Sequence, residues 1–270
     1  MRDLHRSLER SAGARRPLGE PGRIPVVALP TLVPAMALSV TPPRAAAAAA
    51  LHGQLARVLA AADPWSGHPA LVHSLATVAG LAERLREGLA EGMAPIEASA
   101  APAGTPSQPY FRTRTLPLTA RQTLVEGLGV LARAAGDIGH APLAAHDVAA
   151  ELAALRQALE YWADAAGVSG AEADIQPPAP PPHASGAFPD CVWAERWLIG
   201  HHCRFFLEAT ATALITRAAT RVRRRQPQQA AVDLARATVC VQGLPAAVAH
   251  ACALPTAHYS AEIRPGLDTP

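Results

Sequence analysis

Residues 142–167 read PLAAHDVAAELAALRQALEYWADAAG, and this stretch decides the fold class. Apolar side chains recur in it every three or four positions, which is the spacing that lines one face of an α-helix. Pro142 suits the first turn of a helix, and Gly167 suits the position just past its end. The stretch therefore predicts an amphipathic helix, with these residues on its buried face: Val148, Leu152, Leu155, Leu159 and Trp162.

The same periodicity continues on both sides of this stretch. Aromatic residues make up only 4% of the chain, and the composition is poor in strand-forming residues. Thr119 and Gln122 have the spacing of a capping box, which marks a helix start. The sequence therefore predicts an all-α multi-helix bundle. Its other helices are expected over residues 45–62, 69–92, 119–136, 191–219, 227–243 and 246–253.

Proline-rich segments suggest the domain organisation. Residues 1–43 are predicted to form an extended proline-rich arm, because prolines interrupt the apolar run over residues 24–40 and argue against a signal sequence. Residues 44–270 are expected to form a single helical domain with a proline-rich loop at 169–189. We find no uninterrupted apolar run long enough to span a membrane, so a cytoplasmic protein is expected.

Charge and cysteine content exclude several function classes. The 24 basic and 22 acidic residues give a net charge of +2, which favours neither a nucleic-acid partner nor a disordered acidic chain. No membrane partner is expected either, because the chain lacks a long apolar run. All basic residues are arginine. The four cysteines form no Cys-x-x-Cys unit, which argues against zinc ribbons and c-type haem attachment, and all four are predicted to be reduced core residues.

One predicted helix contains most of the residues that could bind a cofactor or act in catalysis. Its sequence over residues 195–208 is ERWLIGHHCRFFLE. At ~100° per residue, His202 projects onto the apolar face beside Phe205, whereas His201 lies on the flank of the helix. A histidine in an aromatic, apolar groove can ligate haem iron, and Gly200 would leave room for a planar group. The alternative is that His202 is a hydrogen-bonded core residue and that His201 lies at the surface.

A second histidine and three arginines are candidates for the remaining roles. His73 has small neighbours on a long helix that is expected to pack across from residues 193–206, so it is the candidate acid–base residue. His68 is its competitor, and a solvated His73 is the alternative. Arginine suits bidentate carboxylate binding, and the candidates for binding a substrate carboxylate or haem propionates are Arg112, Arg114 and Arg264.

Three strings carry a family resemblance: WLIGHHCRF at 197–205, RTRTLPLT at 112–119, and Tyr259 followed by Ile-Arg-Pro at 263–265. With them the chain resembles the histidine-ligated haem enzymes related to tryptophan 2,3-dioxygenase, and most of all the haem-dependent L-tyrosine 3-hydroxylases. The resemblance implies an all-α fold, haem b held by a helix-borne histidine, and hydroxylation of an amino acid by peroxide or dioxygen. The iron ligand then falls on His202 or on its neighbour His201, with Trp197 and Phe205 beside the cofactor.

Two hypotheses of function follow. The first is a haem-dependent oxygenase that hydroxylates a tyrosine-like aromatic amino acid in natural-product biosynthesis. The second is a non-catalytic helical adaptor or regulatory protein, in which Arg221 to Arg225 form a contact patch. Alanine-rich helix faces favour a homodimer in either case. Bound haem gives an intense Soret band, so an absorption spectrum separates the two hypotheses.

Overall fold

The computed structural model describes residues 28–30, 42–91, 93, 114–116, 118–168 and 192–264, and it is all-α, as the sequence predicts. Two three-residue strands, β1 (Ala28–Pro30) and β2 (Arg114–Leu116), pair in parallel. The long helices are α2 (Pro42–Ala61), α3 (His68–Ala90), α4 (Ala120–Ile138), α5 (Ala145–Ala166), α6 (Val192–Arg223) and α7 (Pro227–Cys252). A short α8 (Thr256–His258) runs into a π-helical turn, η1 (Tyr259–Ile263).

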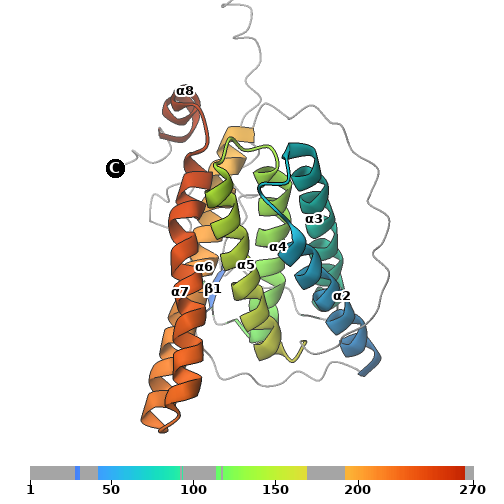
Figure 1. Ribbon diagram of the computed structural model, residues 1–270, viewed down its shortest axis with the longest axis vertical. Coiled ribbons are helices and arrows are strands. Elements are labelled where there is room, and N and C mark those ends of the chain that lie inside the picture. The colour runs from blue at the N-terminus through green and yellow to red at the C-terminus, as the bar shows by residue number, and fades with distance from the viewer. Residues whose placement is uncertain are drawn as a thin grey trace, which may run out of the picture.

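The helices form a bundle in which α6 and α7 make the most extensive pair (Figure 1). Helix α5 packs on α7, and α4 lies between α3, α5 and α6, while α2 covers α3 and α5. The lower end of the α6–α7 hairpin extends beyond the other helices (Figure 1). The main core runs through α2 to α7 and is built chiefly from leucine and alanine. Helix α6 therefore has α4, α5, α7 and the turn η1 as its helical neighbours.

Helix ends agree with the sequence where capping chemistry sets them. The Gln122 backbone N–H donates to Thr119 Oγ1 at 3.2 Å, and the Thr119 N–H donates to Gln122 Oε1 at 2.9 Å, so the capping box is confirmed. Gly167 follows α5 with a φ of 69°, a conformation that glycine adopts without strain. The helix expected over residues 119–136 does not end at Gly136, because this exposed glycine lies inside α4.

The C-terminal helix also differs from the prediction, which divided it near Gly243. Helix α7 continues through Gly243 and Pro245 as one helix of 26 residues. Gly243 faces α5, where an added Cβ would collide with the side chain of Ala154. Pro245 lies on the exposed side of the helix. Close packing against α5 therefore accounts for this glycine, and tertiary contacts keep the helix continuous despite the two helix-breaking residue types.

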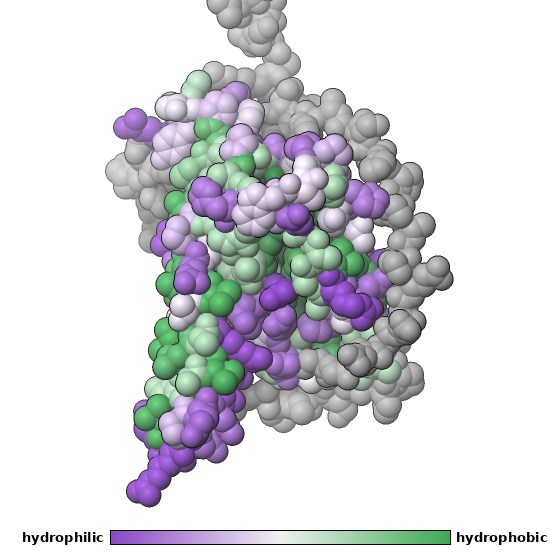
Figure 2. Space-filling view, in the orientation of Figure 1, coloured by the Kyte–Doolittle hydropathy of each residue, from purple (hydrophilic) through white to green (hydrophobic). Residues whose placement is uncertain are grey.

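Helix α7 is long and apolar enough to cross a membrane, although the sequence analysis expected no such segment. Core helices of globular proteins pass the same test of length and composition, and α7 packs against α5 and α6. Green apolar surface follows this helix in Figure 2.

The predicted homodimer stays a prediction. The exposed large apolar residues of α6 and α7 are Ile215, Val222, Val232, Leu234, Val241 and Val248.

Candidate functional site

The histidine pair on α6 is held in two different hydrogen-bonding states. His201 Nδ1 lies 2.9 Å from the carbonyl oxygen of Trp197. A carbonyl only accepts hydrogen bonds, so Nδ1 must carry the proton and donate. Burial lowers the pKa of His201, and the Trp197 ring lies against the imidazole with 4.4 Å between centroids. In the neutral ring the lone pair is therefore on Nε2, which is the state of a metal-binding histidine whose other nitrogen donates to a carbonyl.

His202 has the opposite arrangement. The side chain is buried, as predicted, and Arg133 Nη2 lies 3.3 Å from its Nδ1. A guanidinium only donates, so Nδ1 is the acceptor and the proton of the neutral ring lies on Nε2. Burial, followed by the positive charge of Arg133, lowers the pKa of His202 to about 3. The ring is therefore neutral at physiological pH.

Gly200 does not provide the space for a planar group that the sequence analysis expected. An added Cβ at this position would collide with the backbone of Ala251 and lie 2.7 Å from the carbonyl oxygen of Ala247. Both residues belong to α7. The glycine therefore allows α6 and α7 to approach closely, and α7 occupies the space beside it.

The aromatic residues near the histidine pair occupy different environments. Trp197 is buried in a small cluster with Ala251 and Ile263. Phe205 is only half-buried, whereas Phe206 is buried and its ring covers Gly127 of α4. The structure thus places Trp197 directly against His201. The cofactor-binding roles of Trp197 and Phe205 stay predictions.

The candidate acid–base residue lies elsewhere in the bundle. His73 is exposed on α3, and α3 packs on α2 and α4. The expectation that this helix packs across from α6 is therefore wrong. His68 begins α3 and is also exposed. The catalytic role predicted for His73 stays a prediction.

The three predicted carboxylate-binding arginines are not assembled into a site that the structure describes. Arg112 lies outside the described residues, and Arg114 lies in β2. Arg264 directly follows η1 and is exposed. Their roles also stay predictions.

A charged cavity of about 460 Å³ lies between α3 and α4, and no sequence motif predicted it. Glu83 and Arg86 form an ion pair at one wall, at 2.7 Å. Burial raises the pKa of Glu126. Arg133 Nε is buried and has no hydrogen-bond partner among the described residues, while Nη2 of the same side chain reaches His202. The lining residues are Ala79, Glu83, Arg86, Val125, Glu126, Gly129, Ala132 and Arg133.

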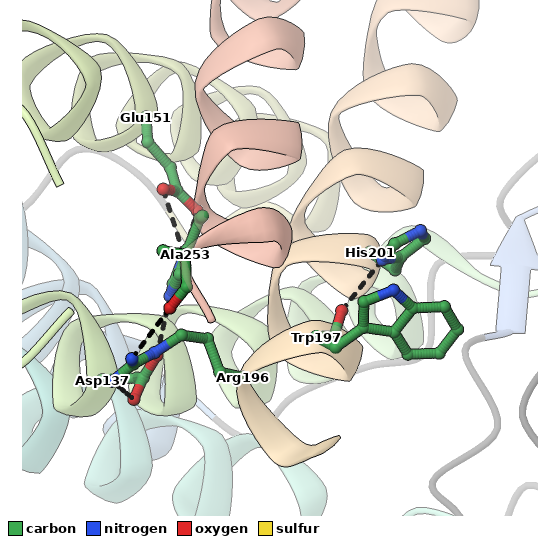
Figure 3. A network of polar contacts seen from close by, with 7 residues as sticks. Asp137, Glu151, Arg196, Trp197, His201 and Ala253 are labelled. Atoms are coloured by element: carbon green, nitrogen blue, oxygen red, sulfur yellow. Dashed lines mark hydrogen bonds and ion pairs between the residues drawn. The ribbon is translucent and has the colours of Figure 1, made fainter. Parts of the chain in front are cut away.

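A second polar group that the sequence analysis missed is a buried cluster on four helices (Figure 3). Arg196 donates to both oxygens of Asp137, at 2.7 and 3.0 Å, and to the carbonyl of Ala253 at 3.0 Å. His250 Nε2 contacts Asp137 at 2.9 Å, and its Nδ1 contacts Glu151 at 3.0 Å. Figure 3 shows Asp137 and Glu151 on one side of α6, and His201 with Trp197 on the other.

The charges within this buried cluster stabilise one another. Burial alone would lower the pKa of His250, but its hydrogen bonds to Asp137 and Glu151 raise it to about 9. Burial alone would raise the pKa of Asp137, yet the hydrogen bonds from His250 and Arg196 lower it. The cluster thus holds two cations and two anions, which connect α4, α5, α6 and α7. In the sequence, the one sign of this cluster is the presence of charged residues on otherwise apolar helix faces.

The cysteines agree only in part with the prediction of four reduced core residues. Cys203 and Cys240 are free and buried, whereas Cys252 is free and exposed. Cys191 lies outside the described residues. Burial, together with the neighbouring Glu151, raises the pKa of the Cys203 thiol.

The fold and the paired histidines describe an all-α protein with a histidine-bearing central helix. A family model, the SfmD 3-methyl-L-tyrosine peroxygenase family, matches residues 18–270. The chain belongs to this family. Searches of curated proteins and of solved structures returned no match. A wider relation to tryptophan 2,3-dioxygenase is therefore not confirmed.

Family membership decides between the two hypotheses of function. Peroxygenases are hydroxylating enzymes, so the prediction of a haem-dependent aromatic hydroxylase is confirmed at the level of the family, and the family implies haem iron. The adaptor hypothesis is set aside. Its contact patch is also partly engaged within the chain, because Arg221 forms an ion pair with the buried Asp233 of α7 at 3.0 Å.

Proposed function

We propose that this protein uses peroxide and haem b to hydroxylate the aromatic ring of a tyrosine-like amino acid in natural-product biosynthesis. In this reaction an aromatic C–H bond becomes C–OH, and the second oxygen of hydrogen peroxide leaves as water. The family name supports 3-methyl-L-tyrosine as the first substrate to test. Haem, when bound, supplies the iron at which peroxide is activated.

The proposal rests on the hydrogen bond from His201 Nδ1 to the carbonyl of Trp197. This bond fixes the ring and leaves its lone pair on Nε2, the atom that binds iron in histidine-ligated haem proteins. His202 was the first choice from the sequence, because its side chain lies on the apolar face. The donated hydrogen bond from Arg133 favours the tautomer with a protonated Nε2, which is the wrong state for a ligand. We therefore assign the ligand role to His201.

The charged cavity between α3 and α4 fits the amino-acid part of the substrate. A free amino acid carries a carboxylate and an ammonium group, and the walls of the cavity provide two arginines and two glutamates. Arg133 Nε can donate to a carboxylate, since it has no hydrogen-bond partner among the described residues. The other end of the guanidinium contacts His202, the neighbour of His201. Arg133 thus links the cavity to the histidine pair.

His73 fits less well as an acid–base group for a substrate in this cavity. The cavity-lining residues of α3 are Ala79, Glu83 and Arg86. At ~100° per residue, His73 lies roughly 100° around the helix from the centre of that face. If His73 acts in the reaction, it acts on a proton outside the cavity.

Two single variants and a control test the ligand assignment. We expect His201→Ala to lose the Soret band of protein expressed with a haem precursor, and to lose formation of the singly oxygenated product by mass spectrometry. His202→Ala should keep the band and a part of the turnover. His146→Ala, at an exposed position of α5, should match the wild type. Loss of the band in His202→Ala alone would reject the assignment, and a wild-type protein without a Soret band would reject the proposed function.

A further inference from the structure

Three donor side chains that the proposed reaction does not use meet in the interior of the bundle. They are Glu151 of α5, Cys203 of α6 and His250 of α7. Their donor atoms, one oxygen, one sulfur and one nitrogen, all lie within 4.8 Å of one another. All three residues are fully buried. Side chains on three separate helices thus converge on one point.

We propose that Glu151, Cys203 and His250 bind a divalent cation of the zinc class. Thiolate, imidazole nitrogen and carboxylate oxygen are the three protein donors that zinc prefers, at bond lengths of about 2.0 to 2.3 Å. Donors at these bond lengths from one tetrahedral ion are separated by roughly 3 to 4 Å. The 3.0 Å between His250 Nδ1 and Glu151 Oε1 fits that range. A tetrahedral ion with three protein donors takes a water as its fourth ligand.

The hydrogen bonds that hold the ring of His250 are also typical of a metal site. Histidine ligands generally donate their other ring N–H to a carboxylate, which orients the ring and increases its basicity. His250 Nε2 makes this bond to Asp137 at 2.9 Å. Asp137 is fixed in turn by two hydrogen bonds from Arg196. A chain of hydrogen bonds from Arg196 through Asp137 therefore orients His250 Nδ1 toward Glu151.

Binding of the cation leaves the net charge of the buried cluster unchanged, because the cation replaces protons. Both nitrogens of His250 contact carboxylate oxygens, which accept hydrogen bonds, so the ring holds two protons when no cation is present. The buried thiol of Cys203 holds another proton, because burial disfavours the thiolate. Binding of one divalent cation releases two protons, one from Nδ1 of His250 and one from the thiol. The net charge of the buried cluster stays zero, which avoids the cost of an uncompensated buried charge.

This cation would cross-link α5, α6 and α7, and would reach α4 through Asp137. Glu151 lies on the other side of α6 from His201 (Figure 3), so the cation would fix the helix that presents the proposed haem ligand from the opposite side. The zinc site can be tested independently of the proposed function, because zinc is measured separately from iron.

Metal analysis and calorimetry test the site in the full-length wild-type protein. We expect about one zinc per chain by mass spectrometry of the purified protein. After treatment with a chelator, added Zn²⁺ should bind and raise the denaturation midpoint. Titrations in two buffers of different ionisation enthalpy should show the release of about two protons per zinc. Absence of zinc from the purified protein, together with no binding of added Zn²⁺ at micromolar concentration, would overturn the proposal.

A matched pair of cysteine variants locates the site. Cys203→Ser should weaken zinc binding at least 100-fold, because it removes the sulfur donor. Cys240→Ser is the control, since Cys240 is equally buried but does not belong to the donor group. Equal zinc affinity in the two variants would overturn the proposal. If Cys203→Ser does not fold, the proton count and the zinc-dependent midpoint of the wild type still decide the question.

Discussion

Two polar regions lie along α4, and they differ in whether their hydrogen bonds are complete. In the buried cluster, Arg196 uses three of its nitrogens and His250 uses both ring nitrogens. In the cavity, Arg133 has a buried Nε without a hydrogen-bond partner among the described residues, and Glu126 has a raised pKa. A closed network of this kind holds helices together. A cavity with a polar group that lacks a hydrogen-bond partner, such as Arg133 Nε, can bind a small polar ligand.

The largest loss of stability is expected from replacing Arg196 in the buried cluster. Arg196→Met removes three hydrogen bonds and leaves the buried Asp137 without its guanidinium partner. Breaking a buried ion pair in this way typically costs about 3–5 kcal/mol. We therefore expect the free energy of unfolding, measured by chemical denaturation, to fall by about that amount.

A second arginine on the same helix provides the control for this variant. Arg204 pairs with Glu208 at 2.8 Å, but both side chains are more than one third exposed. Exposed pairs contribute about 0–1 kcal/mol, so Arg204→Met should lower stability only slightly. Similar losses in the two variants would show that the buried cluster does not hold the helices together.

The close contact of α6 and α7 beside the cluster predicts a second, smaller effect. In Gly200→Ala the new methyl group collides with Ala251, so the two helices must separate. Overpacking of this kind typically costs about 1–3 kcal/mol, and thermal denaturation should show the loss. The shift should also weaken the bond between Arg196 and the carbonyl of Ala253, which lies just past α7.

Gly136→Ala is the matched control in an exposed part of α4. An added Cβ there has no atom within 4 Å, and alanine favours the helix over glycine by roughly 0.5–1 kcal/mol. This variant should therefore be more stable than the wild type. A Gly200→Ala protein as stable as the wild type would contradict the close packing that the structure shows.

The sequence predicts the helices well because helix formation depends on local spacing. Periodic leucines and the Thr119 capping box predict α4 and α5 to within a few residues. The continuous α7 is not predictable in this way, because Gly243 is favoured by its contact with Ala154 on another helix. The buried cluster joins positions 137, 151, 196 and 250, and no pattern within one helix relates them.

For the histidine pair, the angle around the helix predicts burial but not the position of the ring protons. The helical angle alone predicts that His202 is buried and that His201 lies on the flank. It does not predict the tautomers, because these depend on Arg133 of α4 and on a backbone carbonyl one turn away. The choice of iron ligand therefore needs the hydrogen bonds as well as the face of the helix.

The smallest effect on stability is expected in the cavity, at Arg133. The side chain is only partly buried, and its contact with the neutral His202 is 3.3 Å long, so Arg133→Met should change the free energy of unfolding by less than about 1 kcal/mol. Loss of one guanidinium contact to a substrate carboxylate should nevertheless raise KM about tenfold, which corresponds to ~1.4 kcal/mol. Steady-state kinetics with 3-methyl-L-tyrosine and peroxide measure this change. Arg84→Met, on the exposed side of α3, should leave KM unchanged. An unchanged KM in Arg133→Met would exclude Arg133 as the residue that binds the substrate carboxylate in this cavity.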